Sequence, residues 1–267
     1  MTEVHADPAH TAEALLRVGS ELADMVRAPA DMSTSCPGSQ WSVGENATHL
    51  AVANQSFARL AKGEPFIHGD GTPESLAVAN EQLLQRHPER DGDAAADAIL
   101  TGARDLAETL AAEDPTQAVA TPMGTMSLRI LDSYVLTHML MHGVLMAEAL
   151  GRPNPMRREY LPLMLPFFAY AMPKTLDRTQ SNGLTACYQM HFMGGGRLAL
   201  MFDNGELVAA AEPTRRVDCH VLADPVAFLS VVMGQKSQYA AIAQGKLLTW
   251  GRKPWLALRL VGFFNVP

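Results

Sequence analysis

The first 150 residues alternate helical hydrophobic patterns with polar connectors. In residues 11–26 the apolar positions Leu15, Val18, Leu22 and Val26 recur every three or four residues, which predicts an amphipathic helix. Comparable patterns predict further helices over residues 43–62, 74–86, 94–113 and 128–150, and the last of these reads as a buried helix of Leu, Met and Val. Long helices joined by short and medium loops predict a helical bundle.

Local signals mark where two of these helices begin or end. Ser42 is followed three residues later by Glu45, the pattern of a capping box at the start of a helix. Gly151 stands where a helix usually ends in a left-handed residue, and Pro153 prevents continuation. The helix over residues 128–150 should therefore close at about Leu150.

After Pro155 the pattern changes from helical to strand-like. Short runs that alternate or stay apolar occupy residues 184–192, 196–213 and 215–224, and Asn204 with Gly205 provides the best hairpin turn. Helical patterns return at residues 224–234, 238–245 and 253–264; the last is apolar nearly all round, so it should be covered on several sides. The pattern predicts an α+β domain with a small antiparallel sheet.

Length and charge agree with two domains and exclude some partners. The chain has 267 residues, of which 48% are hydrophobic and 18% charged, enough for two ordinary domains, which we place at residues 1–153 and 154–267. A formal net charge of −7 leaves no basic stripe, so nucleic acid is not an expected partner. We expect small-molecule or protein partners and a monomer or homodimer.

The cysteines and the hydropathy bear on the compartment. The three cysteines, Cys36, Cys187 and Cys219, are an odd number without CxxC spacing, which argues against a disulfide framework or a thiolate zinc site. No basic segment followed by an apolar run opens the sequence, and no stretch reaches eighteen uninterrupted apolar residues. These features predict a cytoplasmic protein without a membrane span.

Two histidines interrupt the apolar helix over residues 128–150. His138 and His142 are four residues apart, so on a helix their rings project from one face and can reach one ion. A catalytic zinc site has three protein ligands and an open position. His49, in the middle of the helix over residues 43–62, is the candidate for the third ligand.

The alternative is that these histidines belong to an ordinary core. The chain has nine histidines, so one pair at this spacing is weak evidence by itself, and a core imidazole is commonly satisfied by a backbone carbonyl. Burial among Leu136, Met139, Leu140 and Val144 nevertheless costs free energy unless the rings find partners. A shared cation would provide one.

The segment "WSVGENATHL" (Trp41 to Leu50) resembles the second-helix signature of the DinB-like metalloprotein superfamily. The segment "THMLMHGVLMAEALGRP" is similar to that superfamily's second ligand segment, close to its form in mycothiol-dependent maleylpyruvate isomerases. The resemblance covers about residues 8–152 and implies an up-down four-helix bundle with a divalent metal, zinc or nickel, held by His49, His138 and His142. In the isomerase branch Glu usually stands at the position of His138 and Asp at that of Leu145, so this chain is closer to the broader thiol-transferase members.

The segment from Asp218 to Phe264, with "DPVAFLSVVMG", "YAAIAQGK" and "LLTWG", resembles the sterol carrier protein 2 (SCP2) family. This resemblance covers about residues 157–267 and implies a five-stranded sheet, helices on one face and an apolar cavity that holds lipid in some relatives. The competing interpretation is that the apolar residues only fill the core.

Three functions follow from these features. Three neutral histidines would leave an ion its full charge, which favours ionisation of a bound thiol; we therefore expect an S-transferase or isomerase in which a low-molecular-weight thiol, mycothiol by resemblance, attacks a small electrophile. A hydrolase using bound water is a second reading, with Glu45 or Asp132 as general base or as an ordinary acid near a helix start. The third is a lipid carrier without catalysis.

Arginines are the remaining candidates for binding. Arg215, Arg216 and Arg252 have the planar donor groups that bind a carboxylate of a thiol cofactor or substrate.

Overall fold

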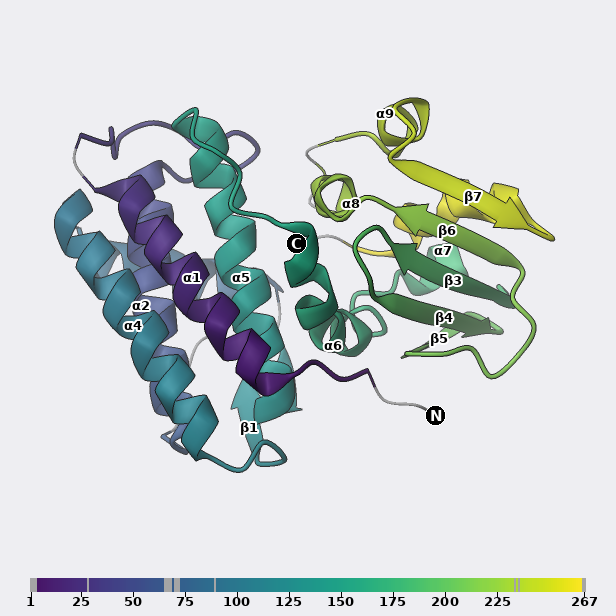
Figure 1. Cartoon of the computed structure of the whole chain (residues 1–267), viewed down its shortest axis with the longest axis horizontal. Coiled ribbons are helices and arrows are strands. Elements are labelled where there is room, and N and C mark those ends of the chain that lie inside the picture. The colour runs from purple at the N-terminus through teal and green to yellow at the C-terminus, as the bar shows by residue number, and fades with distance from the viewer. Residues whose placement is uncertain are drawn as a thin grey trace. The chain divides into compact units, whose positions relative to one another are not determined.

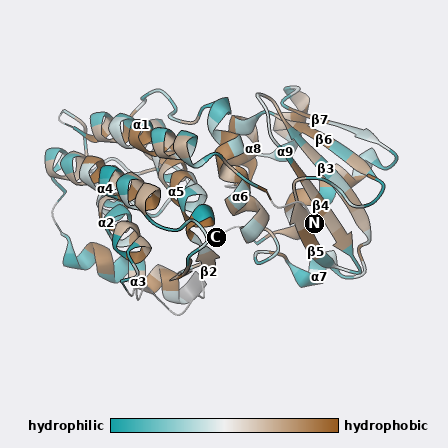
Figure 2. Cartoon of the chain, turned by 60° about the horizontal axis from the view of Figure 1, so that its bottom comes forward, coloured by the Kyte–Doolittle hydropathy of each residue, from teal (hydrophilic) through white to brown (hydrophobic). Residues whose placement is uncertain are grey.

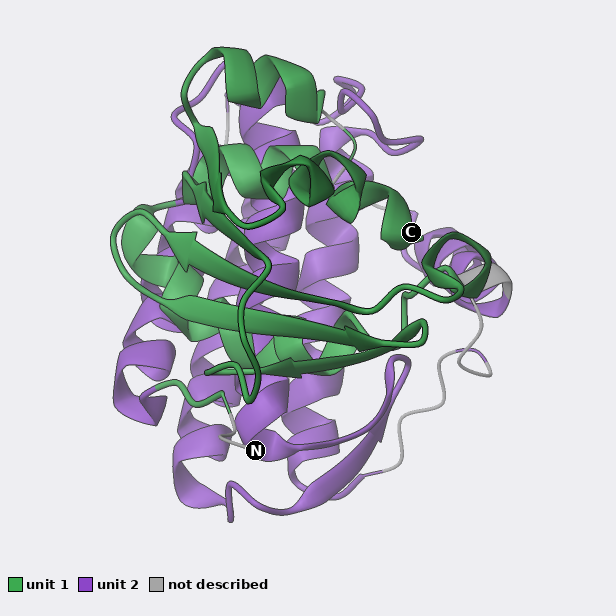
Figure 3. Ribbon diagram, turned by 90° about the vertical axis from the view of Figure 1, so that its right-hand side faces the viewer, with its two compact units in different colours: residues 1–6, 157–267 green, residues 7–156 purple. Residues whose placement is uncertain are grey.

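The structure is a computed structural model that describes residues 4–27, 29–64, 69, 73–88, 90–232, 234 and 236–265. It contains ten α-helices and two β-sheets among the described residues. The chain divides into two compact units, one formed by Asp7–Met156 and the other by Arg157–Pro267 with Met1–Ala6 (Figure 3). Each unit is described by itself.

The unit formed by Asp7–Met156, the helical unit, is built on long helices (Figure 1). Helix α1 packs on α4 and α5, and α2 packs on α4 and α5. The bounds are α1 Pro8–Val26, α2 Val43–Ala61, α3 Pro73–Arg86, α4 Gly92–Ala112 and α5 Leu128–Ala149. Leu15, Leu50, Leu106 and Leu136 are fully buried, so the apolar stripes of the sequence do face one another.

The predicted ends of α2 and α5 are confirmed. The Ser42 side chain accepts from the Glu45 backbone N–H, and the Glu45 carboxylate accepts from the Ser42 N–H at 2.7 Å, which makes a capping box. Gly151 has φ 60°, the left-handed conformation that ends a helix.

A short hairpin between α4 and α5 was not expected from the sequence. Strands β1 Ala118–Thr121 and β2 Gly124–Ser127 pair antiparallel through the turn at Pro122 and Met123. Each strand has four residues, too short for an alternating pattern to stand out from the surrounding turn residues.

Helix α5 has the length and hydropathy of a membrane-spanning helix, the only one found in the part of the chain that the structure describes. However, 67% of its apolar window is buried inside the structure, as for the core helix of a soluble bundle. This one helix is weak evidence for a membrane span.

The unit formed by Arg157–Pro267, the sheet unit, contains a five-stranded sheet in the order β5-β4-β3-β6-β7. Its strands are β3 Ala186–Phe192, β4 Arg197–Asp203, β5 Glu206–Ala210, β6 Cys219–Ala223 and β7 Leu247–Gly251. Strands β3 and β6 are parallel, so the prediction of an antiparallel sheet is wrong for this pair. The chain between β5 and β6 crosses to the free edge of β3, and no hydrophobic pattern reveals such a crossing.

Helices cover one face of this sheet. They are α6 Leu161–Ala171, α7 Arg178–Ser181, α8 Pro225–Val232, α9 Gln238–Ala243 and α10 Ala257–Leu260, with the 3-10 turns η1 Arg158–Tyr160, η2 Pro254–Leu256 and η3 Val261–Phe263. The Phe202 ring lies 5.4 Å from that of Phe263, and the Phe192 ring 5.1 Å from that of Phe228. Figure 2 shows hydrophobic residues along α6 and the strands that form this core.

The C-terminal apolar segment is helical as predicted, with η2, α10 and η3 in succession over residues 254–263. It is not covered on several sides, because Trp255 and Leu258 are exposed. The hairpin turn between β4 and β5 is as predicted, because Asn204 and Gly205 both have positive φ, 47° and 90°.

Candidate metal centre

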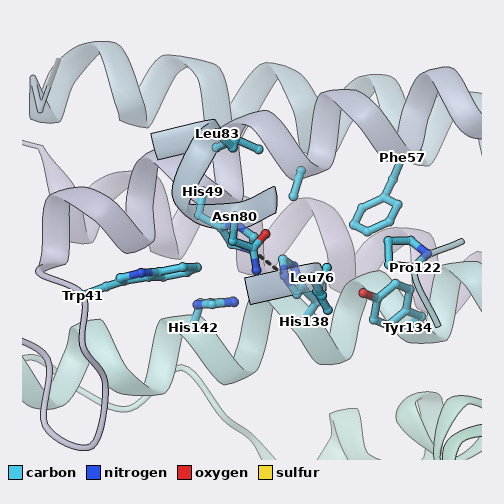
Figure 4. Close-up of a pocket in the computed structure, with 11 residues that line it drawn as sticks. Trp41, His49, Phe57, Leu76, Asn80, Leu83, Pro122, Tyr134, His138 and His142 are labelled. Atoms are coloured by element: carbon cyan, nitrogen blue, oxygen red, sulfur yellow. Dashed lines mark hydrogen bonds between the residues drawn. The ribbon is translucent and has the colours of Figure 1, made fainter. Parts of the chain in front are cut away.

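Three histidines from two helices meet inside the helical unit (Figure 4). His138 and His142 lie one turn apart on α5, with ring centroids 4.6 Å apart. His49 approaches from α2, and its Nε2 lies 3.0 Å from Nε2 of His138. Each residue offers a ring nitrogen, and these three atoms lie within 4.8 Å of one another.

Asn46 fixes the orientation of His142. Its Oδ1 lies 2.7 Å from Nδ1 of His142, and its Nδ2 donates to the Ser42 carbonyl at 2.9 Å and to Cys36 Sγ at 3.4 Å. Because the amide donates through Nδ2, its oxygen accepts, so His142 carries its proton on Nδ1. The Nε2 lone pair of His142 is thereby available as a ligand.

Burial also keeps His142 neutral. Loss of hydration lowers the pKa of His142 to about 4. A neutral imidazole is the form that binds a metal ion.

Aromatic rings enclose the three histidines. Trp41 stacks on His142 with centroids 6.0 Å apart and an interplanar angle of 12°. On the opposite side the rings of Phe57 and Tyr134 each lie 6.0 Å from that of His138. The cavity between them has a volume of about 110 Å³, and its lining is completed by Ala53, Leu76, Asn80, Leu83 and Pro122.

Tyr134 contributes a proton donor to this cavity. Burial raises the pKa of its hydroxyl to about 12, so the group stays protonated at neutral pH. It lines the same cavity as the histidines.

The residues present fit a divalent ion. Two nitrogens bound tetrahedrally at about 2.0–2.1 Å are separated by roughly 3.3 Å, close to the 3.0 Å between Nε2 of His49 and Nε2 of His138. Three histidines with an open position form the donor set of one kind of catalytic zinc site. The rest of the cavity lining is mostly apolar, so few other groups there could bind the ion in place of the histidines.

The two acids proposed as general bases have other positions. Glu45 belongs to the cap of α2, where hydrogen bonds from Ser42 lower its pKa. Asp132 is buried on α5 and accepts from the Ser133 N–H. Neither acid is among the residues that line the cavity.

The three arginines lie in the sheet unit. Arg215 donates to the carbonyls of Ala186 and Phe202, and so fastens a loop to the strands. Arg252 lies 3.4 Å from Asp218, and Arg216 is exposed. Two of the three thus make local contacts within their own unit.

Several residues around the histidines were not singled out as site residues from the sequence: Asn46, Phe57, Asn80, Pro122 and Tyr134. Asn46 lies three residues before His49 and Tyr134 four residues before His138, so helical spacing alone would have placed both near a ligand. No comparable signal identifies Asn80 or Pro122, which come from other segments.

Comparison with known proteins identifies the helical unit. The family described as mycothiol maleylpyruvate isomerase N-terminal domain matches residues 12–145, half of the chain. The chain belongs to this family. A second family, described as the SCP-2 sterol transfer family, matches residues 171–258.

Solved structures resemble the chain over nearly its whole length. The crystal structure of the mycothiol-dependent maleylpyruvate isomerase covers 93% of this chain and 95% of its own, with 15% identity and a TM-score of 0.56. A mutant of that isomerase, with one histidine replaced by alanine, gives 14% identity, the same coverage and the same TM-score. No curated protein sequence matches the chain. At 14–15% identity, this likeness shows that the chain has the fold of that isomerase and carries no conclusion about its activity.

Proposed function

We propose that this chain is a metal-dependent S-transferase or isomerase that uses a low-molecular-weight thiol, mycothiol by analogy with the family, against a small electrophile. The observation that carries the proposal is the convergence of His49, His138 and His142 on one aromatic cavity. The family match, which includes all three histidines, supports dependence on a thiol.

The finer architecture is part of the same proposal. We regard the helical unit as an up-down four-helix bundle of the DinB-like type, formed by α1, α2, α4 and α5. The sheet unit is an SCP2-like domain, as its family match suggests. A reducing, cytoplasmic setting suits a thiol reaction, and Cys36, Cys187 and Cys219 are all free.

The three histidines would hold a divalent ion, which we take to be zinc, with nickel as the alternative. Because all three ligands are neutral, such an ion would keep its full charge and lower the pKa of a thiol placed beside it. Asn46 keeps His142 in the tautomer that presents Nε2. Trp41 and Phe57 line the cavity and would shield a thiol bound there from water, which would make its anion more reactive.

Tyr134 would act on the electrophile. Its hydroxyl remains protonated at neutral pH, so it can donate a hydrogen bond to an oxygen on which negative charge develops. The small cavity, about 110 Å³, favours a small electrophile at the reacting end of the thiol.

Metal analysis tests the site first. We expect about one zinc or nickel ion per purified chain, and none in the His138→Ala, His142→Ala double variant. The matched control is His191→Ala with His220→Ala, which removes another close histidine pair, 3.1 Å apart in the sheet unit. Equal metal content in wild type and the His138, His142 variant would refute the site.

Cobalt substitution then tests the thiol. We expect a low-molecular-weight thiol to change the visible spectrum of the cobalt form, because sulfur would enter the coordination sphere. A spectrum that no thiol perturbs, mycothiol included, would leave a metal site but exclude thiol activation.

A further inference from the structure

The end of the chain has a charge opposite to that of the whole. Residues 225–267 contain the cations Lys236, Lys246, Arg252, Lys253 and Arg259 and no Asp or Glu, in a chain with a formal net charge of −7. Such segregation concentrates positive potential on one part of the sheet unit, where it attracts anionic partners.

Large apolar side chains are exposed in the same segment. Tyr239 is 63% exposed, Trp255 60% and Leu258 44%. Single exposed apolar residues are ordinary, but these three are among the eight large ones exposed in the described residues, and they lie close together in sequence. Leu248 and Trp250 of β7 are also exposed, but they share the sheet face of His191 and His220 and are not part of this group. This concentration indicates a surface that meets a partner.

The elements that carry these residues are adjacent. Gln238 Nε2, at the start of α9, donates to the Leu258 carbonyl of α10 at 2.9 Å. Helix α9 also packs against β7, as Figure 1 shows, and β7 packs against η2. Tyr239, Trp255 and Leu258, with the cations around them, therefore belong to one region, which we call the C-terminal patch.

Exposed cations frame the C-terminal patch. Lys236 precedes α9, Lys246 follows it, and Arg259 is next to Leu258; all three are exposed. In the part of the chain that the structure describes, Lys236 and Arg259 have no carboxylate within salt-bridge distance. Arg252 and Lys253 share Asp218, each at 3.4 Å, so one acid offsets part of their charge.

This combination suits an anionic bilayer surface. Tryptophan and tyrosine favour the boundary between lipid headgroups and acyl chains, and lysine and arginine are attracted to anionic headgroups. A soluble acidic ligand would explain the cations but not the exposed Trp255 and Leu258. A second copy of this acidic chain would explain the apolar residues and, through its charge, some of the attraction.

We propose that the C-terminal patch docks the protein on anionic lipid membranes, with Tyr239, Trp255 and Leu258 entering the interface and the surrounding cations binding headgroups. The contact is peripheral, because the elements involved are too short to cross a bilayer. The proposal is independent of the metal centre.

Vesicle binding tests this. The full-length protein is mixed with sucrose-loaded vesicles of phosphatidylcholine, or of phosphatidylcholine with 30% phosphatidylglycerol, and sedimented. We expect binding to the anionic vesicles only, weakened at least tenfold by 0.5 M salt because exposed charges are then screened. Removing one cation, as in Lys246→Gln, should weaken binding by about fivefold.

Separate variants test the apolar side chains of the C-terminal patch. Trp255→Ser with Leu258→Ser should weaken binding at least tenfold. Val208→Ser and Arg197→Gln are matched controls, since they change an exposed apolar residue and an exposed cation elsewhere in the same unit, and they should bind as wild type. Circular dichroism confirms that each variant is folded.

Three results would overturn the proposal. Wild type could fail to distinguish the two vesicle types, or the patch variants could bind as well as the controls. The third is a dimer that Trp255→Ser with Leu258→Ser converts to monomer, without anionic vesicle binding by wild type; the patch would then contact a second copy.

Discussion

Each imidazole in the core of the helical unit is constrained by specific neighbours. His142 hydrogen-bonds Asn46 and stacks on Trp41, and His49 pairs with His138. Asn46 itself is fully buried and is held by Ser42, the residue that caps α2. The start of α2 thus fixes, through Asn46, the orientation of a ligand on α5.

Replacing Asn46 should weaken metal binding without removing a ligand. In Asn46→Leu the acceptor for Nδ1 of His142 is lost, so the ring is free to rotate and to change tautomer. We expect the dissociation constant for zinc to rise about 10- to 100-fold. Competition with a chromophoric chelator measures it.

The matched control is Asn46→Asp, which keeps an oxygen acceptor for His142 and should bind zinc at least as tightly as Asn46→Leu. An Asn46→Leu protein with wild-type affinity would show that packing against Trp41 alone orients His142.

Asp132 should make stability depend on pH. Burial raises its pKa from 3.8 to about 7, so the folded state favours the protonated carboxyl. Its contribution is complete below about pH 4 and is lost as the pH rises through 7. At pH 8 we expect Asp132→Asn to raise the free energy of unfolding by about 2–4 kcal/mol, at 1.36 kcal/mol per pKa unit.

Urea unfolding at pH 4.5 and pH 8 measures this effect. Asn keeps an oxygen for the Ser133 N–H, so the two proteins should differ little at pH 4.5. Glu108→Gln, at an exposed position on α4, serves as the control and should change stability little at either pH. A variant no more stable than wild type at pH 8 would contradict the raised pKa of Asp132.

At the level of elements, the sequence predicts what depends on local chemistry. The start of α2 followed from Ser42 and Glu45, and the end of α5 from Gly151, because these residues act on their own backbone. The β4–β5 turn followed from Asn204 and Gly205 for the same reason. The parallel pairing of β3 with β6 did not follow, since it depends on where a loop crosses the sheet.

In the candidate site, too, local spacing predicts some features and the packing of helices decides the others. His138 and His142 were placed together by spacing on one helix, whereas the closeness of His49 was only an expectation until the packing of α2 on α5 was known. The roles of Asn46 and Tyr134 depend on how each helix is rotated about its axis. Hydrophobic stripes define that rotation only approximately.

Close helix contact in the helical unit depends on Gly19. A Cβ at this position of α1 would lie 2.7 Å from Cβ of Ala103 on α4. In Gly19→Ala the helices must separate, so we expect a loss of about 1–3 kcal/mol in the free energy of unfolding, larger than the gain of about 1 kcal/mol in helix propensity.

A double variant tests whether crowding between positions 19 and 103 causes the loss of stability. Adding Ala103→Gly to Gly19→Ala removes the opposing Cβ, so the double variant should be less destabilised than the sum of the two single variants. Strictly additive effects in urea unfolding would show that the two positions do not interact.

At the scale of the whole molecule, the candidate metal centre and the C-terminal patch belong to separate compact units. The helical unit contains the histidines and the aromatic cavity, and the sheet unit contains the C-terminal patch. Each unit has its own buried core, for example Leu136 in one and Phe202 in the other. A ligand of either unit should therefore act first on the unit that binds it.

Hydrogen exchange with and without zinc tests this separation. A ligand that binds only the folded state adds about 2.7 kcal/mol of stability at 100 times its dissociation constant, which slows exchange through global opening about 100-fold. We expect this slowing for amides of α2 and α5, which carry the three histidines, and no change for those of β3 and β4. The His138→Ala, His142→Ala variant should show no slowing anywhere. Equal slowing in β3 and α5 would instead mean that the two units open as one, and that zinc binding to the helical unit also stabilises the sheet.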